Sequence, residues 1–281
     1  MADNEPATTR RLADLPSALD SFDSFEARLG GRIPAVFLDY DGTLTPIVAR
    51  PELAILNERD RATVSRLAAR VPVAVISGRD RADVERLVGI DGLTFAGSHG
   101  FDIRAAGGRH LEHGVGGEFG PALDRVEADL RARLGPIDGA LVERKKYSIA
   151  AHYRLVAEAE LPAFRAALDD ALADQPTLKR MRGKKVVEIE PALDWNKGKA
   201  VLWLLEALGL DDGRHVAVFL GDDVTDEDAL AVLQNGGIGV VVADPADEPE
   251  RPTAAAYRVD DPALAVALLG RLSDRAAKEE T

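Results

Sequence analysis

The feature of this sequence that most constrains its fold is a series of short apolar runs separated by segments long enough for a helix. The runs are rich in β-branched and aromatic residues and lie at 33–38, 73–76, 93–96, 215–220 and 238–242. Runs of this length and composition indicate buried strands. Strands that alternate with helices form right-handed βαβ units. The sequence therefore predicts a doubly wound, parallel α/β core.

The segments between these runs carry apolar residues at helical spacing. We predict helices for the core at 15–29, 58–70, 81–88, 197–208 and 227–233. The Pro- and acid-rich stretch 244–253 is expected to be a surface loop.

The middle of the chain has a different pattern and predicts an inserted α+β unit over residues 102–190. Two hairpin turns are expected, at Gly107-Gly108 and at Gly183-Lys184, each between strand-like segments. Two helices (119–134 and 158–172) and two antiparallel strands within 140–153 complete this unit. We expect residues 1–101 and 191–281 to form the core, and the insertion to act as a cap.

Composition excludes several classes of protein. The 281 residues include no cysteine, so a disulfide framework and a cysteine nucleophile are excluded. The chain has no apolar run of about 18 residues, which argues against a membrane span. The beginning of the chain is acidic and polar, unlike a signal peptide, and a cytoplasmic location is expected.

The formal net charge of −13 argues against binding to nucleic acid. Residues 141–190 depart from this trend, because they contain ten Lys/Arg against eight Asp/Glu. This local excess indicates either a place where an anion is held or a solvated hairpin face.

Polar clusters follow three of the predicted core strands and open one of the helices. They are Asp39-Tyr-Asp41-Gly-Thr43, Ser77-Gly78-Arg79, Gly221-Asp222-Asp223-Val-Thr-Asp226 and Asn196-Lys197. Ligands of open α/β sheets bind beyond the carboxyl ends of the strands. These groups can therefore converge on one edge of the sheet. Taken singly, the Ser-Gly turn and the acidic first turn of a helix also have purely structural explanations.

Together these side chains suit phosphoryl transfer. A hard cation such as Mg²⁺ prefers oxygen ligands, which Asp39, Asp222 and a backbone carbonyl can supply. Asp39 can act as a nucleophile toward phosphorus. Asp41 can then act as general acid and base. Clustered carboxylates need a compensating cation, for which Lys197 is the candidate. Ser77 can donate a hydrogen bond to a phosphoryl oxygen.

With these motifs the chain resembles the haloacid dehalogenase superfamily and, more narrowly, the trehalose-6-phosphate phosphatase family. The segment Phe37-Leu-Asp-Tyr-Asp-Gly-Thr-Leu-Thr-Pro-Ile47 is similar to that family's first motif. The later clusters are similar to its other motifs, as is Gly97-Ser-His-Gly100, over about residues 34–269. The resemblance implies a Mg²⁺-dependent phosphatase with an inserted cap of the C2 type.

The resemblance also implies a role for each motif residue. Asp39 would be the nucleophile, Asp41 the acid and base, and Ser77 and Lys197 contacts of the phosphate. Asp39, Asp222 and the carbonyl of Asp41 would hold the metal. Further roles follow for support of the metal site (Asp223, Asp226) and for binding of the substrate in the Ser77 turn (Gly78, Arg79).

The predicted cap offers candidate residues for contact with a sugar. Five of its residues are expected to bind the substrate: Glu143, Lys145, His152, Arg154 and Glu188. His99, which lies just after a core strand, is expected to bind the substrate as well. If the chain is extended from Ser148 to Arg154, His152 and Arg154 lie on one face, because strand side chains alternate. The alternative is a charge pair on an exposed hairpin.

One departure from the family pattern leaves the substrate open. The family usually carries a basic residue before the proline that follows Glu188, whereas this chain has Glu190-Pro191. The expected partner is a phosphorylated disaccharide, with no obligatory protein partner evident. Trehalose 6-phosphate is favoured, and sucrose-, glucosylglycerol- and mannosylglycerate-phosphate types stay open. A phosphomutase and a catalytically silent sugar-phosphate-binding protein are more distant alternatives.

Overall fold

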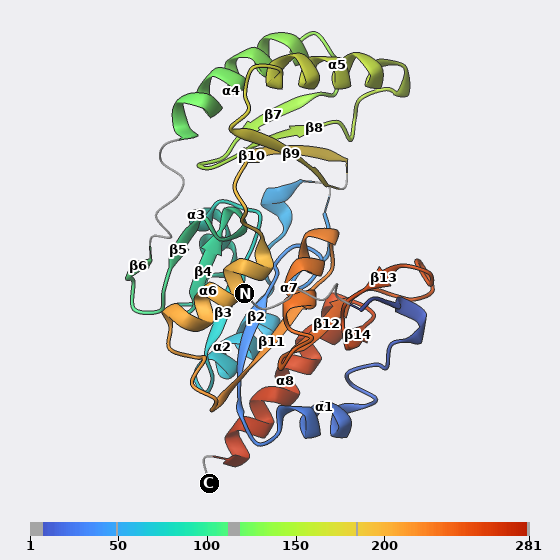
Figure 1. Cartoon of the computed structure of the whole chain (residues 1–281). Coiled ribbons are helices and arrows are strands. Elements are labelled where there is room, and N and C mark those ends of the chain that lie inside the picture. The colour runs from blue at the N-terminus through green and yellow to red at the C-terminus, as the bar shows by residue number, and fades with distance from the viewer. Residues whose placement is uncertain (1–7, 49, 112–118, 184, 280–281) are drawn as a thin grey trace. The chain divides into compact units, whose positions relative to one another are not determined.

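The computed structural model describes residues 8–48, 50–111, 119–183 and 185–279. The chain divides into two compact units. Unit 1 comprises residues 1–111 and 195–281, and unit 2 comprises residues 112–194. Figure 1 shows the elements of each unit. In the described residues, no helix is both long and apolar enough to cross a membrane.

Unit 1 is built on an eight-stranded sheet with the order β14-β12-β11-β2-β3-β4-β5-β6. Its strands are β2 (Ile33–Leu38), β3 (Val73–Ile76), β4 (Thr94–Gly97), β5 (Asp102–Arg104), β6 (His110–Leu111), β11 (His215–Gly221), β12 (Ile238–Val242) and β14 (Tyr257–Val259). A separate two-stranded sheet joins β1 (Arg10–Arg11) to β13 (Pro252–Thr253). The longer helices are α1 (Phe22–Leu29), α2 (Glu58–Ala68), α3 (Arg81–Val88), α6 (Lys197–Ala207), α7 (Glu227–Val232) and α8 (Pro262–Glu279), and the 3₁₀ turns are η1 (Leu12–Asp14), η2 (Pro51–Leu53), η3 (Ser98–Gly100) and η6 (Val224–Asp226).

The strand order places a topological switch point between β2 and β11. From β2 the chain proceeds outward through β3 to β4, and from β11 it proceeds the other way through β12 to β14. All of these neighbours pair in parallel, whereas β5 and β6 add an antiparallel edge. A crevice for ligands forms beyond the carboxyl ends of the strands at such a point. The two Asp-rich motifs follow β2 and β11.

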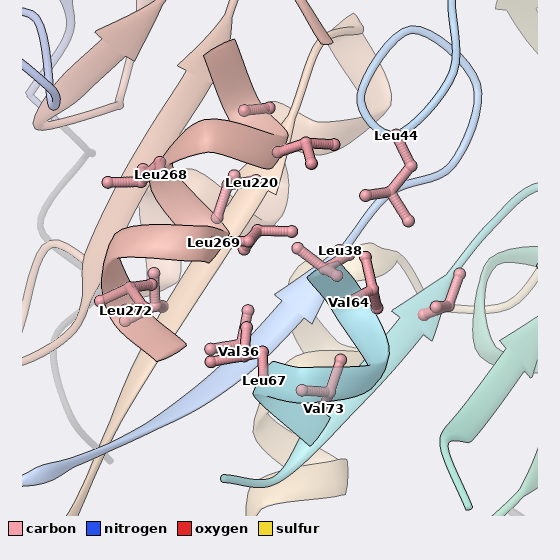
Figure 2. Close-up of a cluster of buried hydrophobic side chains, with 14 of the residues drawn as sticks. Val36, Leu38, Leu44, Val64, Leu67, Val73, Leu220, Leu268, Leu269 and Leu272 are labelled. Atoms are coloured by element: carbon pink, nitrogen blue, oxygen red, sulfur yellow. The ribbon is translucent and has the colours of Figure 1, made fainter. Parts of the chain in front are cut away.

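The central strands are buried on both faces, which explains their continuous apolar runs. Val36 and Leu38 of β2 face a cluster formed with α2 and α8, and Figure 2 shows Leu67 and Leu269 pointing into it. The intervening Phe37 faces the opposite cluster, to which α6 and α7 contribute. This packing fixes β2 from both sides and so fixes the position of the residue that follows it.

Unit 2 is an antiparallel sheet of order β7-β8-β10-β9, with two helices on one face. Its elements are α4 (Gly120–Leu134), β7 (Leu141–Arg144), β8 (Ile149–His152), η5 (Glu158–Glu160), α5 (Leu161–Leu172), β9 (Leu178–Gly183) and β10 (Val186–Pro191). Val142, Ile149 and Ile189 pack against Val126 and Phe164 of the helices. Residues on the other sheet face alternate with these, and no helix in the described part of this unit covers them.

The predicted α/β core with an inserted α+β unit is confirmed, and the limits of the insertion differ from those expected. The hairpin at Gly107-Gly108 was expected in the insertion, but its strands β5 and β6 extend the core sheet. The separate unit therefore spans 112–194, compared with the expected 102–190. Composition around a hairpin does not report which sheet its strands will join.

Other elements differ in their ends or were not predicted. The helix expected over 15–29 begins at Phe22, and the helix expected over 58–70 ends at Ala68. Within the expected loop 244–253, the last two residues pair with β1. No element was predicted after residue 253, where β14 and the long helix α8 complete the core.

Candidate active site

A buried ion network occupies the switch point. The ammonium of Lys197 donates to Oδ1 of Asp39 at 2.7 Å and to Oδ1 of Asp226 at 2.6 Å. All three residues are buried, with Asp39 only 5% exposed. Buried charges are stable only when they are paired and hydrogen-bonded. Lys197 therefore holds together two carboxylates that come from opposite sides of the switch point.

Helix beginnings position Lys197 and Asp226, the other two members of this network. The side chain of Asn196 accepts from the backbone N–H of Lys199 at 2.9 Å, which caps α6 and directs Lys197 at its first position. Asp223 and Asp226 form a capping box around η6. Within that box, Oδ2 of Asp226 accepts the backbone N–H groups of Asp222 and Asp223 at 3.1 and 3.0 Å. The capping network thus fixes the loop that carries Asp222.

Burial controls the protonation equilibria at this site. Burial raises the pKa of Asp39 well above its ordinary value, although the Lys197 ammonium opposes the rise. Burial also raises the pKa of Asp222 to about 7, and the negative charge of Asp226 adds to this effect. Burial disfavours the Lys197 ammonium, but Asp226 and Asp39 outweigh it, so the pKa of Lys197 lies above its ordinary value. The carboxylate cluster lacks positive charge even with Lys197 in place.

The carboxylates of Asp39, Asp222 and Asp226 fit a divalent cation. One oxygen of each lies within 4.8 Å of the others. Both oxygens of Asp226 already accept protein hydrogen bonds. By contrast, Oδ1 of Asp222 is buried and has no hydrogen-bond partner in the described part of the chain. A buried orphan oxygen beside Asp39 suits a cation that prefers oxygen ligands, such as Mg²⁺.

Gly42 allows the loop after β2 to approach Asp222. Its φ of +87° lies in the left-handed region, and a Cβ atom there would lie 2.1 Å from Oδ2 of Asp222. The N–H of Gly42 also donates to the carbonyl of Thr45 at 2.7 Å, which closes a turn. Glycine at this position therefore brings the backbone around Asp41 against the carboxylate cluster.

The side chain of Asp41 belongs to a different contact. Arg79 donates from Nε to Oδ2 of Asp41 and from Nη2 to Oδ1, both at 2.6 Å. This is a two-bond fork between a guanidinium and a carboxylate. Arg79 was predicted to bind substrate in the Ser77 turn, and its partner in this structure is Asp41. The predicted role of the Asp41 carbonyl toward the metal stays a prediction.

The Ser77 turn lies against an unusual stretch of backbone. Ser98 and His99 have φ values of 50° and 56°, which are uncommon for residues with side chains. The N–H of His99 donates to the carbonyl of Ser77 at 2.9 Å, and a Cβ at Gly78 would lie 2.8 Å from the His99 ring. The structure thus brings His99 onto the Ser77 turn. Ser77 itself is buried, and its Oγ accepts the N–H of Arg79 at 3.1 Å.

Four predicted sugar contacts gather on the helix-free face of the unit 2 sheet. Glu143 and His152 form one pair, with Oε2 and Nε2 2.9 Å apart. Lys145 donates to Oε1 of Glu188 at 2.5 Å, and Ser148 donates to the same oxygen at 3.1 Å. The hydrogen bond from His152 lowers the pKa of Glu143. This face therefore combines charges and hydrogen-bonding groups suited to a polyhydroxylated ligand.

The alternation argument for Arg154 is wrong. Strand β8 ends at His152, and the chain turns at once, with the N–H of Val156 donating to the carbonyl of Tyr153 at 3.2 Å. Arg154 is exposed in that turn and does not continue the strand face of His152. Alternation holds only where backbone pairing continues, and here the last bond to the neighbouring strand is the one from the N–H of Tyr153 to the carbonyl of Lys185 at 3.1 Å, just before Arg154.

Glu190 is neutralised inside unit 2. It is 6% exposed, and Lys179 lies opposite it in the β9–β10 register with Nζ 3.2 Å from Oε1. The negative charge that departed from the expected pattern thus has its cation on the neighbouring strand. The turn expected at Gly183-Lys184 includes Lys184, which lies outside the described residues, and the observed register of the two strands sets this pair.

Two further residues of the site were missed. Asp83 accepts from Nη1 of Arg79 at 3.0 Å, and Tyr40 lies with its ring centroid 5.6 Å from the Arg79 guanidinium carbon. Arg79 precedes the helix that carries Asp83, so helical spacing alone does not predict this pair. Tyr40 was noted only as part of a motif.

Comparisons with known proteins agree with this geometry. The family model described as trehalose-phosphatase matches residues 37–263. A trehalose-phosphate phosphatase of Mycobacterium tuberculosis is 40% identical over 265 residues, covering 94% of this chain and 67% of the relative. A trehalose 6-phosphate phosphatase of Zea mays is 38% identical, covering 92% and 75%.

A solved structure shows the same fold. The C-terminal domain of the Candida albicans trehalose-6-phosphate phosphatase matches with a TM-score of 0.78 at 23% identity, covering 93% of this chain and 99% of that one. The match to the family model extends over most of the chain, from β2 into α8. The chain belongs to the trehalose-phosphatase family of phosphoric monoester hydrolases.

Proposed function

We propose that this protein hydrolyses trehalose 6-phosphate to trehalose and phosphate. The observation that carries the proposal is the buried Asp39–Lys197 pair at the switch point, together with an Asp222 oxygen that has no hydrogen-bond partner among the described residues. The residues supply a nucleophile, a fixed cation and oxygen ligands for a metal. Membership of the trehalose-phosphatase family supports the choice of substrate.

The chemistry needs two transfers of the phosphoryl group. A carboxylate oxygen of Asp39 attacks phosphorus, and the bond from phosphorus to the sugar oxygen breaks while Asp41 gives that oxygen a proton. Asp41 then takes a proton from water as the water oxygen attacks phosphorus, and the bond to Asp39 breaks. Lys197 and Ser77 hold phosphoryl oxygens, as fixed charges and donors do best in a buried site.

The metal in this proposal is Mg²⁺. Asp39, Asp222 and the backbone carbonyl of Asp41 would hold it, while Asp223 and Asp226 fix the supporting loop through their capping box. When bound, the cation supplies positive charge that offsets the clustered carboxylates and the phosphate. The raised pKa values of Asp39 and Asp222 support a need for such charge.

For unit 2 we propose the role of a substrate-binding cap. The helix-free sheet face would bind the sugar through Glu143, Lys145, His152 and Glu188. His99 and Arg154 stay candidates for further contacts with the substrate. The Lys179–Glu190 pair removes the electrostatic objection to a trehalose substrate, because Glu190 presents no uncompensated charge.

Phosphate release from trehalose 6-phosphate tests the proposal directly. The purified protein is assayed with Mg²⁺ against trehalose 6-phosphate, sucrose 6-phosphate, and the phosphates of glucosylglycerol and mannosylglycerate. We expect the highest kcat/KM for trehalose 6-phosphate, with none detectable for Asp39→Asn. A higher value for another member of the panel would contradict the proposed substrate. Phosphate transfer to a second sugar position, without release, would instead indicate a phosphomutase.

A further inference from the structure

The guanidinium of Arg79 forms hydrogen bonds with several groups within unit 1. Besides its two bonds to Asp41, the guanidinium donates from Nη1 to Asp83 at 3.0 Å and from Nη2 to the carbonyl of Pro51 at 2.9 Å. Its side chain is 11% exposed and lies over the Tyr40 ring. Four of the five N–H donors of a guanidinium are thus used by these bonds. A guanidinium in this state is poorly suited to bind a substrate phosphate as well.

The support behind Arg79 is rigid. Asp83 lies in the first turn of α3, and the Tyr40 hydroxyl donates to the carbonyl of Ala54 at 2.5 Å. Tyr40 is fully buried. Its ring and the start of α3 therefore restrict where the guanidinium can lie, and the fork in turn restricts the plane of the Asp41 carboxylate.

The fork leaves Asp41 able to react. A carboxylate offers about four lone-pair positions, and a bidentate guanidinium occupies one on each oxygen. A second position on each oxygen stays open to the leaving-group oxygen or to water. General acid–base catalysis requires that such an oxygen be held within hydrogen-bond reach of the group it serves. A carboxylate on a loop needs a partner to hold it there.

We propose that Arg79 is a positioning residue that orients the carboxylate of Asp41 through a two-bond fork, and that it is not a ligand of the substrate phosphate. This inference rests on the proposed function, because it takes Asp41 as the acid and base. It differs from the role implied for the Ser77-Gly78-Arg79 turn, in which Arg79 binds substrate.

The test compares leaving groups. Arg79→Lys keeps a positive charge but cannot form the planar fork. Its kcat/KM should fall at least tenfold for trehalose 6-phosphate and for glycerol 2-phosphate, whose alkoxide leaving groups need a proton. For p-nitrophenyl phosphate, whose leaving group needs little protonation, it should change less than about threefold. The inhibition constant of inorganic phosphate should stay within about twofold.

A double-mutant cycle separates positioning from direct binding. If Arg79 acts through Asp41, Arg79→Lys should add no further loss in an Asp41→Asn background. If Arg79 were instead a ligand of the phosphate, Arg79→Lys would lower activity in both backgrounds and weaken inhibition by phosphate. That result would overturn the proposal. If the role of Arg79 were purely structural, Arg79→Lys would lower the melting temperature and reduce kcat/KM equally for all substrates. This result also would overturn the proposal.

Arg86→Lys is the matched control. Arg86 lies on α3, is exposed and pairs with the other oxygen of Asp83, and within the described residues it has no hydrogen bond or ion pair with Asp41. The Arg86→Lys variant should behave as the unaltered protein on all three substrates.

If trehalose 6-phosphate is not hydrolysed by the unaltered protein, the proposed function fails. The Arg79 inference is then judged on the ratio of glycerol 2-phosphate to p-nitrophenyl phosphate, which tests it independently.

Discussion

Lys197 is the residue on which the charge balance of the site depends. It bonds two buried carboxylates that would otherwise face each other without compensation. Removal of one partner from a buried ion pair typically costs about 3–5 kcal/mol, because the remaining charge is left buried. The same residue therefore stabilises the fold and prepares the site for a phosphoryl group.

Lys197→Met should lower the free energy of unfolding by about 3–5 kcal/mol and reduce phosphate release by about 10²-fold or more. Urea denaturation and a phosphate assay measure the two effects. Lys278→Met, at an exposed position near the end of α8, serves as the control and should change neither. An unaltered unfolding free energy in Lys197→Met would contradict the buried network.

Substitution of Asp39 and substitution of Asp41 are expected to impair different steps of the reaction. Asp39→Asn removes the nucleophile, so no aspartyl phosphate should form with any substrate. Asp41→Asn should retain some phosphorylation by p-nitrophenyl phosphate, because that leaving group needs little protonation. Borohydride trapping and rates on both substrates measure the difference. Equal proportional losses of p-nitrophenyl and sugar phosphate activity in the two variants would refute the division of roles.

A comparison of Gly42→Ala with Gly107→Ala separates the strain of a left-handed backbone from a steric clash with Asp222. Gly42 has φ +87° and a Cβ there would meet Asp222, whereas Gly107 has φ +83° with open space around it. Both alanine variants should lose about 1–2 kcal/mol from the left-handed backbone. Only Gly42→Ala should also displace Asp222 and raise the Mg²⁺ concentration needed for half-maximal activity. A normal Mg²⁺ requirement in Gly42→Ala would show that the close approach is unimportant.

Among the elements, the β9–β10 hairpin shows how register compensates a local charge. Glu190 is buried on β10, and the strand pairing places Lys179 opposite it. The same lysine donates to the carbonyl of Leu193 at 3.0 Å. The register of the two strands thus lets one lysine, Lys179, neutralise Glu190 and also hold the chain where it leaves β10.

Lys179→Met should destabilise the protein by about 1–3 kcal/mol, since it leaves a buried carboxylate without its cation. Addition of Glu190→Gln should recover part of that loss, because a neutral amide is less costly to bury. Thermal and urea denaturation of the two single variants and the double variant give the coupling. Additive effects would mean that the pair contributes no interaction of its own.

The central strands were the most predictable elements. Strands β2, β3, β11 and β12 agree closely with their apolar runs, because burial on both faces requires continuous β-branched and aromatic residues. Edge strands carry no such requirement, and the partner sheet of β5 and β6 was predicted wrongly. The end of β8 at His152 was also missed, since the turn that follows has no glycine or proline.

At the scale of the whole molecule, a bound metal should be linked to folding. A ligand that binds only the folded state at 100 times its dissociation constant adds about 2.7 kcal/mol of stability. Saturating Mg²⁺ should therefore raise the melting temperature by on the order of 5 °C. EDTA should abolish both this rise and phosphate release, and Mg²⁺ should restore them.

Asp222→Asn provides the control for this linkage. It removes the charge of the carboxylate with the orphan oxygen, so its melting temperature should respond much less to Mg²⁺. Ca²⁺ should support activity poorly, because its larger and looser coordination suits a different geometry. Full activity in EDTA would contradict the proposed metal.

The sequence alone determined the architecture and the identity of the chemical groups. The spacing of apolar residues and the composition of the apolar runs reveal which strands are buried. The order of the polar clusters places Asp39, Ser77, Lys197 and Asp222 at strand ends or a helix start. These are local properties of the chain, so they can be predicted without a tertiary structure.

Only the tertiary structure decided which of these groups are partners. It joined Lys197 to Asp226 as well as to Asp39, joined Asp41 to Arg79, and gave Glu190 its cation in Lys179. Each pair links residues on different elements or loops, and bonds at 2.6–3.2 Å depend on packing of the strands and helices that carry them. Sequence pattern reports the face and the end of an element, whereas side-chain partnership depends on how complete elements pack.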